Sequence, residues 1–161
     1  GKDKFDYIVL NTGDVVVVDF NINANKRNEL MKIGYDQTME YFKQILPCKK
    51  SKIKDNYFVI LNHLNKINKL ISSNNILKAK MQLGDLFTDL CDLHNIIDLT
   101  DYEDLKSFKN LFLQNIIYPP LFGKAKINNE RFIKTELTRM IKNITDKVAE
   151  LENYLALYPA K

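Results

Sequence analysis

Three side chains able to bind a metal stand at helical spacing in the second half of the chain. Cys91, His94 and Asp98 occupy positions i, i+3 and i+7, so on a helix they could share one face. A soft divalent metal accepts cysteine and histidine, but a closed zinc site needs four ligands. His63 has no ligand-type neighbour at useful spacing. We therefore predict no metal and no cofactor, with Cys91 as a small core residue and His94 as a boundary residue.

Carboxylates offer a second possible chemistry. Asp85, Asp89 and Asp92 line one face of the same expected helix. Nothing in the pattern indicates the raised pKa that a general acid needs, so these groups are expected to face solvent. No nucleophile–base pair is visible in the 161 residues, so we predict no catalytic residue, and an enzyme complete within this chain is the least favoured class. Cys48 and Cys91 have no redox spacing and fit free thiols in a reducing compartment.

Residues 116–127, IIYPPLFGKAKI, are the most informative segment for function. Connections between helices are normally polar, and Pro119-Pro120 prevents these apolar residues from continuing a helix into the core. An exposed apolar loop can insert into a bilayer while neighbouring lysines contact anionic headgroups. The alternative is that the loop folds back and caps the open end of a bundle. The predicted membrane-binding residues are Tyr118, Leu121, Phe122, Lys124 and Lys126.

Charge is strongly segregated behind a formal net charge of +4. Residues 43–54 are basic, residues 85–104 are acidic, and residues 124–147 are basic again. One interpretation is that neighbouring helices attract each other through these faces, and the other is that a basic surface meets an anionic partner. The lysines are not interleaved with exposed aromatic residues, so nucleic acid is not a predicted partner. No apolar run approaches the ~20 residues of a membrane span.

The N-terminal region predicts strands. Residues 5–10 and 15–20 are β-branched and aromatic runs around a turn with Gly13, a pattern typical of a β-hairpin. Val15–Val18 is apolar without alternation, and such a strand needs cover on both faces. Two strands alone cannot supply that cover, so the hairpin is expected to belong to a larger sheet.

The rest of the chain predicts helices. A first helix is expected over 26–46, where Pro47 ends it, followed by a basic linker over 48–54. Thr100 and Glu103 form a capping box that opens a later helix. Four amphipathic helices after the linker are expected over 55–72, over 76–98, from Thr100 until Pro119-Pro120, and from Asn128 or Asn129 to 157, with a break at Ser73-Asn74 and a heptad seam in the last helix. The expected fold is mainly α, with a four-helix bundle over 55–161 preceded by a β-hairpin and one helix.

Residues 7–42 contain short motifs in a fixed order. Asn11-Thr12-Gly13-Asp14 is followed by Asp19-Phe20, and then by a helix with Leu30, Gly34-Tyr35 and Thr38. This order resembles the end of the catalytic domain in patatin-like phospholipases, where a late strand and turn lead to a DF pair and a closing helix carries a GY-x-x-T element. The resemblance implies that residues 1–47 are the tail of an α/β patatin-like domain.

Patatin-like enzymes hydrolyse acyl esters of lipids with a Ser–Asp dyad. The serine lies in G-x-S-x-G, the aspartate lies in a D-G pair, and a Gly-rich loop supplies the oxyanion hole. This chain has none of these motifs, and Asp14 and Asp19 match the turn and the strand rather than the dyad. The resemblance therefore implies a phospholipase A-type parent protein whose catalytic residues are not in these 161 residues.

A helical region after such a domain is similar to the organisation of ExoU- and VipD-type bacterial effectors. There the C-terminal helices place the lipase on host membranes or bind host proteins. The resemblance implies a virulence effector that is secreted into the host cell and acts in the cytosol or at a membrane surface. We predict a membrane-targeting or regulatory region that binds anionic lipid, including phosphoinositide. The alternative is a protein-interaction module that binds a host cofactor or a small GTPase in a groove between helices.

Overall fold

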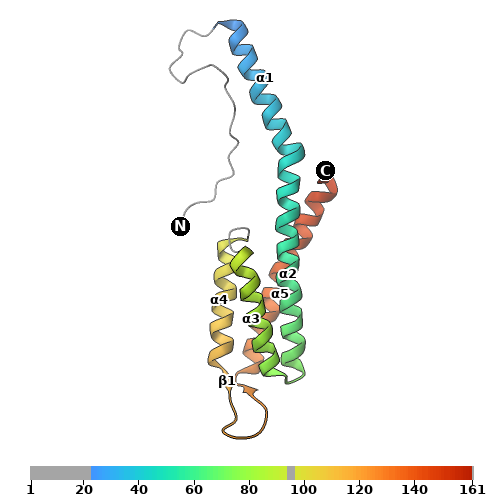
Figure 1. The fold of residues 1–161 in the computed structure, drawn as a ribbon. Helices are drawn as coiled ribbons and strands as arrows, with labels where there is room; N and C mark the ends of the chain where they lie inside the picture. The colour runs from blue at the N-terminus through green and yellow to red at the C-terminus, as the bar shows by residue number, and fades with distance from the viewer. Residues whose placement is uncertain (1–22, 94–96, 161) are drawn as a thin grey trace.

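The computed structural model describes residues 23–93 and 97–160. This part of the chain is mainly α, with four helices and one small antiparallel hairpin just before the C-terminal helix (Figure 1). The predicted strands at 5–10 and 15–20 lie outside the described residues, as does His94.

The first helix is one continuous rod of 49 residues. It consists of α1 (Ala24–Glu40), a π-helical turn η1 (Tyr41–Ile45) and α2 (Leu46–Ser72). The prediction that Pro47 ends the helix is wrong, because the π turn places the proline at a position where its missing N–H is tolerated. The residues predicted as a basic linker, 48–54, are accordingly helical and form the first turns of α2.

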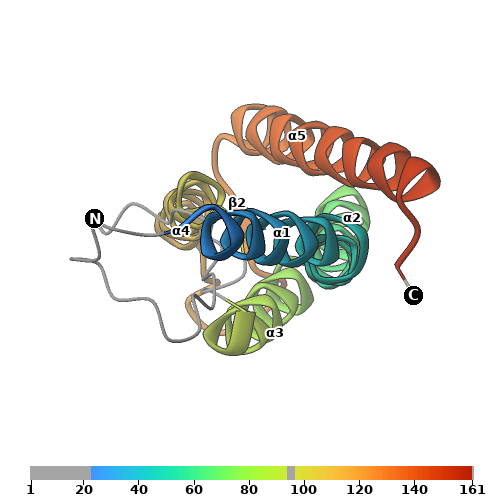
Figure 2. The same cartoon turned by 90° about the horizontal axis from the view of Figure 1, so that it is seen from above.

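The remaining helices are α3 (Ile76–Leu93), α4 (Leu99–Gln114) and α5 (Glu130–Leu157). Seen from above, α2, α3, α4 and α5 surround a common centre, and α1 leans across it (Figure 2). The helix α2 packs mainly against α3 and α5, and α4 packs mainly against α5. The shared core contains Ile60, Leu64, Ile67 and Ile71 of α2, Leu83, Leu86 and Leu90 of α3, Leu105 and Phe112 of α4, and Ile133 and Leu137 of α5. The predicted four-helix bundle is thus present, but its first helix continues into the arm α1.

The helix ends follow local polar chemistry. The predicted break after α2 is confirmed, since Asn74 takes the left-handed conformation at φ 58° and the Asn75 N–H donates to the Leu70 carbonyl at 2.9 Å. The predicted capping box is displaced by two residues, because the Asp98 carboxylate accepts from the Thr100 N–H at 2.8 Å and α4 already begins at Leu99. At the start of α5, Asn129 stands at the N-cap position without a capping bond from its side chain.

Two predicted helices end earlier than expected. The helix α3 ends at Leu93 rather than near 98, and α4 ends at Gln114, before Pro119-Pro120 is reached. In α5 the heptad seam is buried at Leu137, Ile144 and Val148 and becomes exposed toward its C-terminal end. The prolines therefore shape a loop and do not stop a helix.

Candidate functional site

The loop between α4 and α5 is a short β-hairpin at one end of the bundle. Strand β1 (Ile116–Ile117) pairs antiparallel with β2 (Lys126–Ile127), with Ile116 opposite Ile127. Ile116 is buried at the base of the hairpin, as is Ala125 before β2. These contacts fasten the base of the hairpin to the core and leave the tip to project.

Asn115 holds the base of the hairpin through three polar contacts. Its carbonyl accepts from the Asn128 N–H at 2.7 Å, and its side-chain oxygen accepts from the Asn129 amide at 3.1 Å. Its own side-chain amide donates to the Leu111 carbonyl at 2.7 Å. One side chain thus ties the end of α4 to the start of α5, so the loop leaves the bundle in a fixed direction.

The tip of the hairpin exposes its largest apolar side chains. Leu121 is 85% exposed and Phe122 is 93% exposed. The neighbouring Gly123 has φ +113°, a conformation that L side chains rarely adopt. The alternative that Leu121 and Phe122 cap the open end of the bundle is therefore wrong, since that role belongs to the buried Ile116 and Ala125.

Tyr118 connects the hairpin to α3. The Lys80 ammonium donates to the Tyr118 hydroxyl at 2.8 Å and lies 5.3 Å from the centre of its ring. The tyrosine remains 53% exposed, so the pair lies at the surface. This contact places a cationic and an amphipathic group beside the apolar tip.

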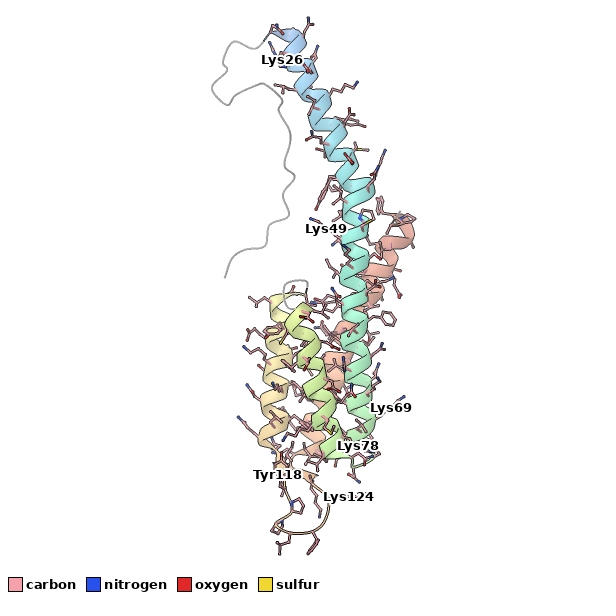
Figure 3. The ribbon with its side chains drawn as sticks, viewed as in Figure 1. Lys26, Lys49, Lys69, Lys78, Tyr118 and Lys124 are labelled. Carbon is pink, nitrogen blue, oxygen red and sulfur yellow. The ribbon has the colours of Figure 1, made fainter. Side chains whose placement is uncertain are left out.

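The four helix ends around the hairpin present the same combination of groups. We use "hairpin end" for this end of the bundle, formed by residues 66–81 and 109–134. Figure 3 places Lys69, Lys78, Tyr118 and Lys124 there, with Lys69 in the last turn of α2 and Lys78 in the first turn of α3. The exposed large apolar residues within these two segments are Leu77, Met81, Leu113, Ile117, Tyr118, Leu121, Phe122 and Phe132. The surface is therefore both apolar and basic.

Acidic residues are nearly absent from the hairpin end. Segments 56–84 and 105–129 contain lysines and no aspartate or glutamate. The acidic segment 85–104 lies around the opposite end, where α3 ends and α4 begins. The bundle is thus electrostatically polarised along its length.

At that opposite end, acidic groups are paired across helices. Arg139 on α5 binds Asp104 on α4 with two hydrogen bonds of 2.9 Å, and Asp104 is the main reason that the pKa of Arg139 is raised. Lys147 on α5 pairs with Asp101, which is only 4% exposed. The interpretation that oppositely charged helix faces attract each other is confirmed for these pairs.

Asp101 also accepts a hydrogen bond of 2.6 Å from the Tyr57 hydroxyl and one of 3.2 Å from Asn143. The Tyr57 hydroxyl in turn accepts from the Asp98 N–H at 3.0 Å. Burial, and then the hydrogen bond to Asp101, raise the pKa of Tyr57 well above its ordinary value. This network joins α2, α4 and α5 and gives both carboxylate oxygens of the buried Asp101 a partner within the protein.

Two of the residues first considered for metal or acid–base chemistry, Asp98 and Asp89, have structural roles. Asp98 caps α4, and Asp89 lies 2.7 Å from His63 Nε2, whose Nδ1 contacts the Gln82 amide at 2.6 Å. The prediction that Cys91 is a small core residue is wrong, because its side chain is exposed on α3. Within residues 23–93 and 97–160, no three histidine, cysteine or acidic side chains could together hold a metal. In the same residues, no helix is long and apolar enough to cross a membrane.

Searches against family models, curated proteins and solved structures find no match for this chain.

Sequence reasoning found the loop but missed its neighbours. Lys69, Lys78, Lys80 and Met81 come from the α2–α3 turn and the start of α3, far from the loop along the chain. The signal that could have found them is the absence of acidic residues over 56–84 and 105–129, taken together with the alternating direction of bundle helices.

Proposed function

We propose that this region binds anionic membranes peripherally through the hairpin end of the bundle. The exposure of Leu121 and Phe122 at a projecting tip, with lysines around it, is the observation that carries the proposal. A fully buried side chain of this kind contributes ~1.5–3 kcal/mol when it leaves water, and each lysine near an anionic surface contributes ~1 kcal/mol. Two inserted side chains and a few lysines therefore suffice for reversible attachment.

The charge distribution supports an end-on orientation. Anionic headgroups attract the hairpin end, and the carboxylates between 85 and 104 are repelled to the far side. The Debye length of ~8 Å at physiological salt restricts the attraction to side chains close to the surface. The lysines of the α2–α3 turn and of the loop would make contact first, and Leu121 and Phe122 would then insert.

For the whole protein, we propose a patatin-like phospholipase A effector of which this is the C-terminal membrane-targeting or regulatory region. The motif order over residues 7–42 supports this assignment. Such an effector would act inside a host cell at the cytosolic face of a membrane. The lipid headgroup would be anionic, with phosphoinositide included in that class.

Co-sedimentation with vesicles of phosphatidylcholine and phosphatidylserine tests the membrane proposal. Leu121→Asp with Phe122→Asp should lower vesicle affinity at least about tenfold, because each charge resists entry into the acyl region. The free energy of unfolding should change by less than ~0.5 kcal/mol, since both side chains are exposed.

The matched control is Leu157→Asp with Tyr158→Asp. These two apolar residues are also exposed, but they lie at the C-terminal end of α5, away from the hairpin. Vesicle binding should be unchanged in the control. Equal loss in both double variants, or no loss in either, would remove the hairpin as the contact.

The second candidate is a protein-interaction module, and the arm favours it. Met31, Tyr35, Phe42 and Ile45 are exposed apolar residues on α1 and η1, far from the hairpin end. A protein-binding region would not bind vesicles of any charge. Substitutions on the arm, and not those in the loop, would then abolish binding to the partner protein.

A further inference from the structure

The long helix contains an irregular segment where it leaves the bundle. In η1 the Leu46 N–H donates to the Tyr41 carbonyl, a bond that spans five residues instead of four. Pro47 follows directly and has no N–H to offer the preceding turn. Kinks in helices occur mostly at such π turns and prolines, and here the two coincide.

Packing changes at the same place. Within the described residues α1 has no buried side chain, whereas Tyr41 and Pro47 are buried and α2 buries residues regularly from Tyr57 onward. The core of the bundle thus holds α2 from Tyr57 onward, and among the described residues α1 packs mainly against η1 (Figure 1).

Tyr41 shows that this segment has an unmet interaction. Its hydroxyl is buried and finds no hydrogen-bond partner among the described residues. Its ring contacts Phe42 edge-on at 5.5 Å, and the Lys49 ammonium lies 5.4 Å from its centre. Buried hydroxyls nearly always have a partner, so the present arrangement of this segment leaves one polar group unsatisfied.

We propose that Tyr41–Pro47 is a hinge about which the arm α1 swings relative to the bundle. This inference does not depend on membrane binding. Its consequence is that the N-terminal end of α1 changes position relative to the hairpin end without any change in the bundle itself. If the hairpin end rests on a surface, the hinge sets how far from that surface the start of α1 is held.

Distances between spin labels measured by double electron–electron resonance test the hinge. One label goes on the natural, exposed Cys91 of α3, and the other on α1 through Asn28→Cys, in a Cys48→Ser background. Position 28 lies ~22 Å along the helix from the middle of η1, so a swing of ~20° moves it by ~8 Å. The control pair, Cys91 with Asn62→Cys, lies wholly within the bundle.

The distance distribution for the Asn28 pair should be broader than that of the Asn62 pair by up to ~8 Å. Pro47→Ala restores the N–H and should narrow the Asn28 distribution toward that of the control. Lys52→Ala replaces an exposed residue one turn further along α2 and should leave the Asn28 distribution broad. The Asn62 pair reports in every variant whether the bundle is folded.

Two outcomes would overturn the proposal. The first is an Asn28 distribution in the unsubstituted chain that is as narrow as that of the Asn62 pair, which would mean a rigid rod. The second is a broad distribution that Pro47→Ala leaves unchanged while the bundle pair stays narrow, which would place the motion elsewhere in α1.

Discussion

The two ends of the bundle use charged side chains in different ways. At the acidic end, Asp101 and Asp104 on α4 are matched by Lys147 and Arg139 on α5, and the partners are held at hydrogen-bonding distance. At the hairpin end, Lys69, Lys78 and Lys124 lie in stretches of sequence that contain no acidic residue at all.

This contrast separates charges that serve the fold from charges that can serve a partner. A buried carboxylate with three polar partners belongs to the interior, and removing any one partner costs stability. Lysines without an acidic partner contribute little to the fold, since Lys69 gains only the weak attraction of a helix C-terminus in the last turn of α2. The same surface exposes Leu121 and Phe122, which likewise add nothing to the core. The hairpin end therefore combines charged and apolar groups that the fold itself does not require.

The largest expected effect tests the structural role of the acidic end. Asp101→Ala should lower the free energy of unfolding by about 3 kcal/mol, because it leaves the Tyr57 hydroxyl and the Lys147 ammonium without their partner. Chemical denaturation measures this loss. Glu103→Ala is the control, since Glu103 is exposed and makes only a 3.8 Å contact with Lys106. A loss no larger than that of the control would mean that the network is not structural.

A smaller effect tests which basic surface meets the membrane. Lys78→Ala with Lys124→Ala should weaken binding to anionic vesicles at low salt by about 2 kcal/mol, or ~30-fold, at ~1 kcal/mol per lysine. The difference should shrink as salt rises, because screening removes the attraction in both proteins.

The matched pair is Lys43→Ala with Lys52→Ala, which removes two exposed lysines from the other basic segment. This segment lies at the junction of the arm and the bundle. Vesicle binding should be retained in this double variant. If instead these two substitutions weaken vesicle binding more than Lys78→Ala with Lys124→Ala does, the membrane contact lies at the junction and the proposed orientation is reversed.

Much of the fold was predictable because its signals are local. The 4,3 spacing in α5 and the Ser73-Asn74 break each depend on a few neighbouring residues. The prediction that Pro47 ends a helix was wrong because the local rule considers only the missing N–H and not the π turn that accommodates it. Tyr41 and Pro47 are also buried, which the local rule does not predict.

The candidate site was predictable only in part for a similar reason. Residues 116–127 stand out by composition, but the base of this hairpin is held by Asn115 through contacts with Leu111, Asn128 and Asn129. The contact between Lys80 and Tyr118 joins positions that sequence spacing does not relate. Local patterns thus identified the loop, and long-range contacts determined its direction.

The smallest expected effect compares a glycine of the hairpin with a glycine of the bundle. Gly123→Ala should lower the free energy of unfolding by ~1 kcal/mol, since φ +113° is strained for any residue with a side chain. The strain is purely conformational, because an added methyl group would lie 3.8 Å from the nearest atom, Pro119 Cβ. Gly84→Ala in α3 should instead raise it by ~0.5–1 kcal/mol, since its added methyl group meets nothing within 4 Å and alanine favours a helix.

Chemical denaturation of the two glycine variants measures both changes in the free energy of unfolding, and the sign of each change is the decisive result. If both variants raise the free energy of unfolding, the loop takes a different conformation when Gly123 is replaced. Hydrogen exchange of the Asn128 amide, which donates to the Asn115 carbonyl, would then separate two cases. Continued protection means that only the tip has rearranged and that its fixed presentation is not needed for stability. Lost protection means that the base has opened, so the direction in which Leu121 and Phe122 project depends on the conformation of this one glycine.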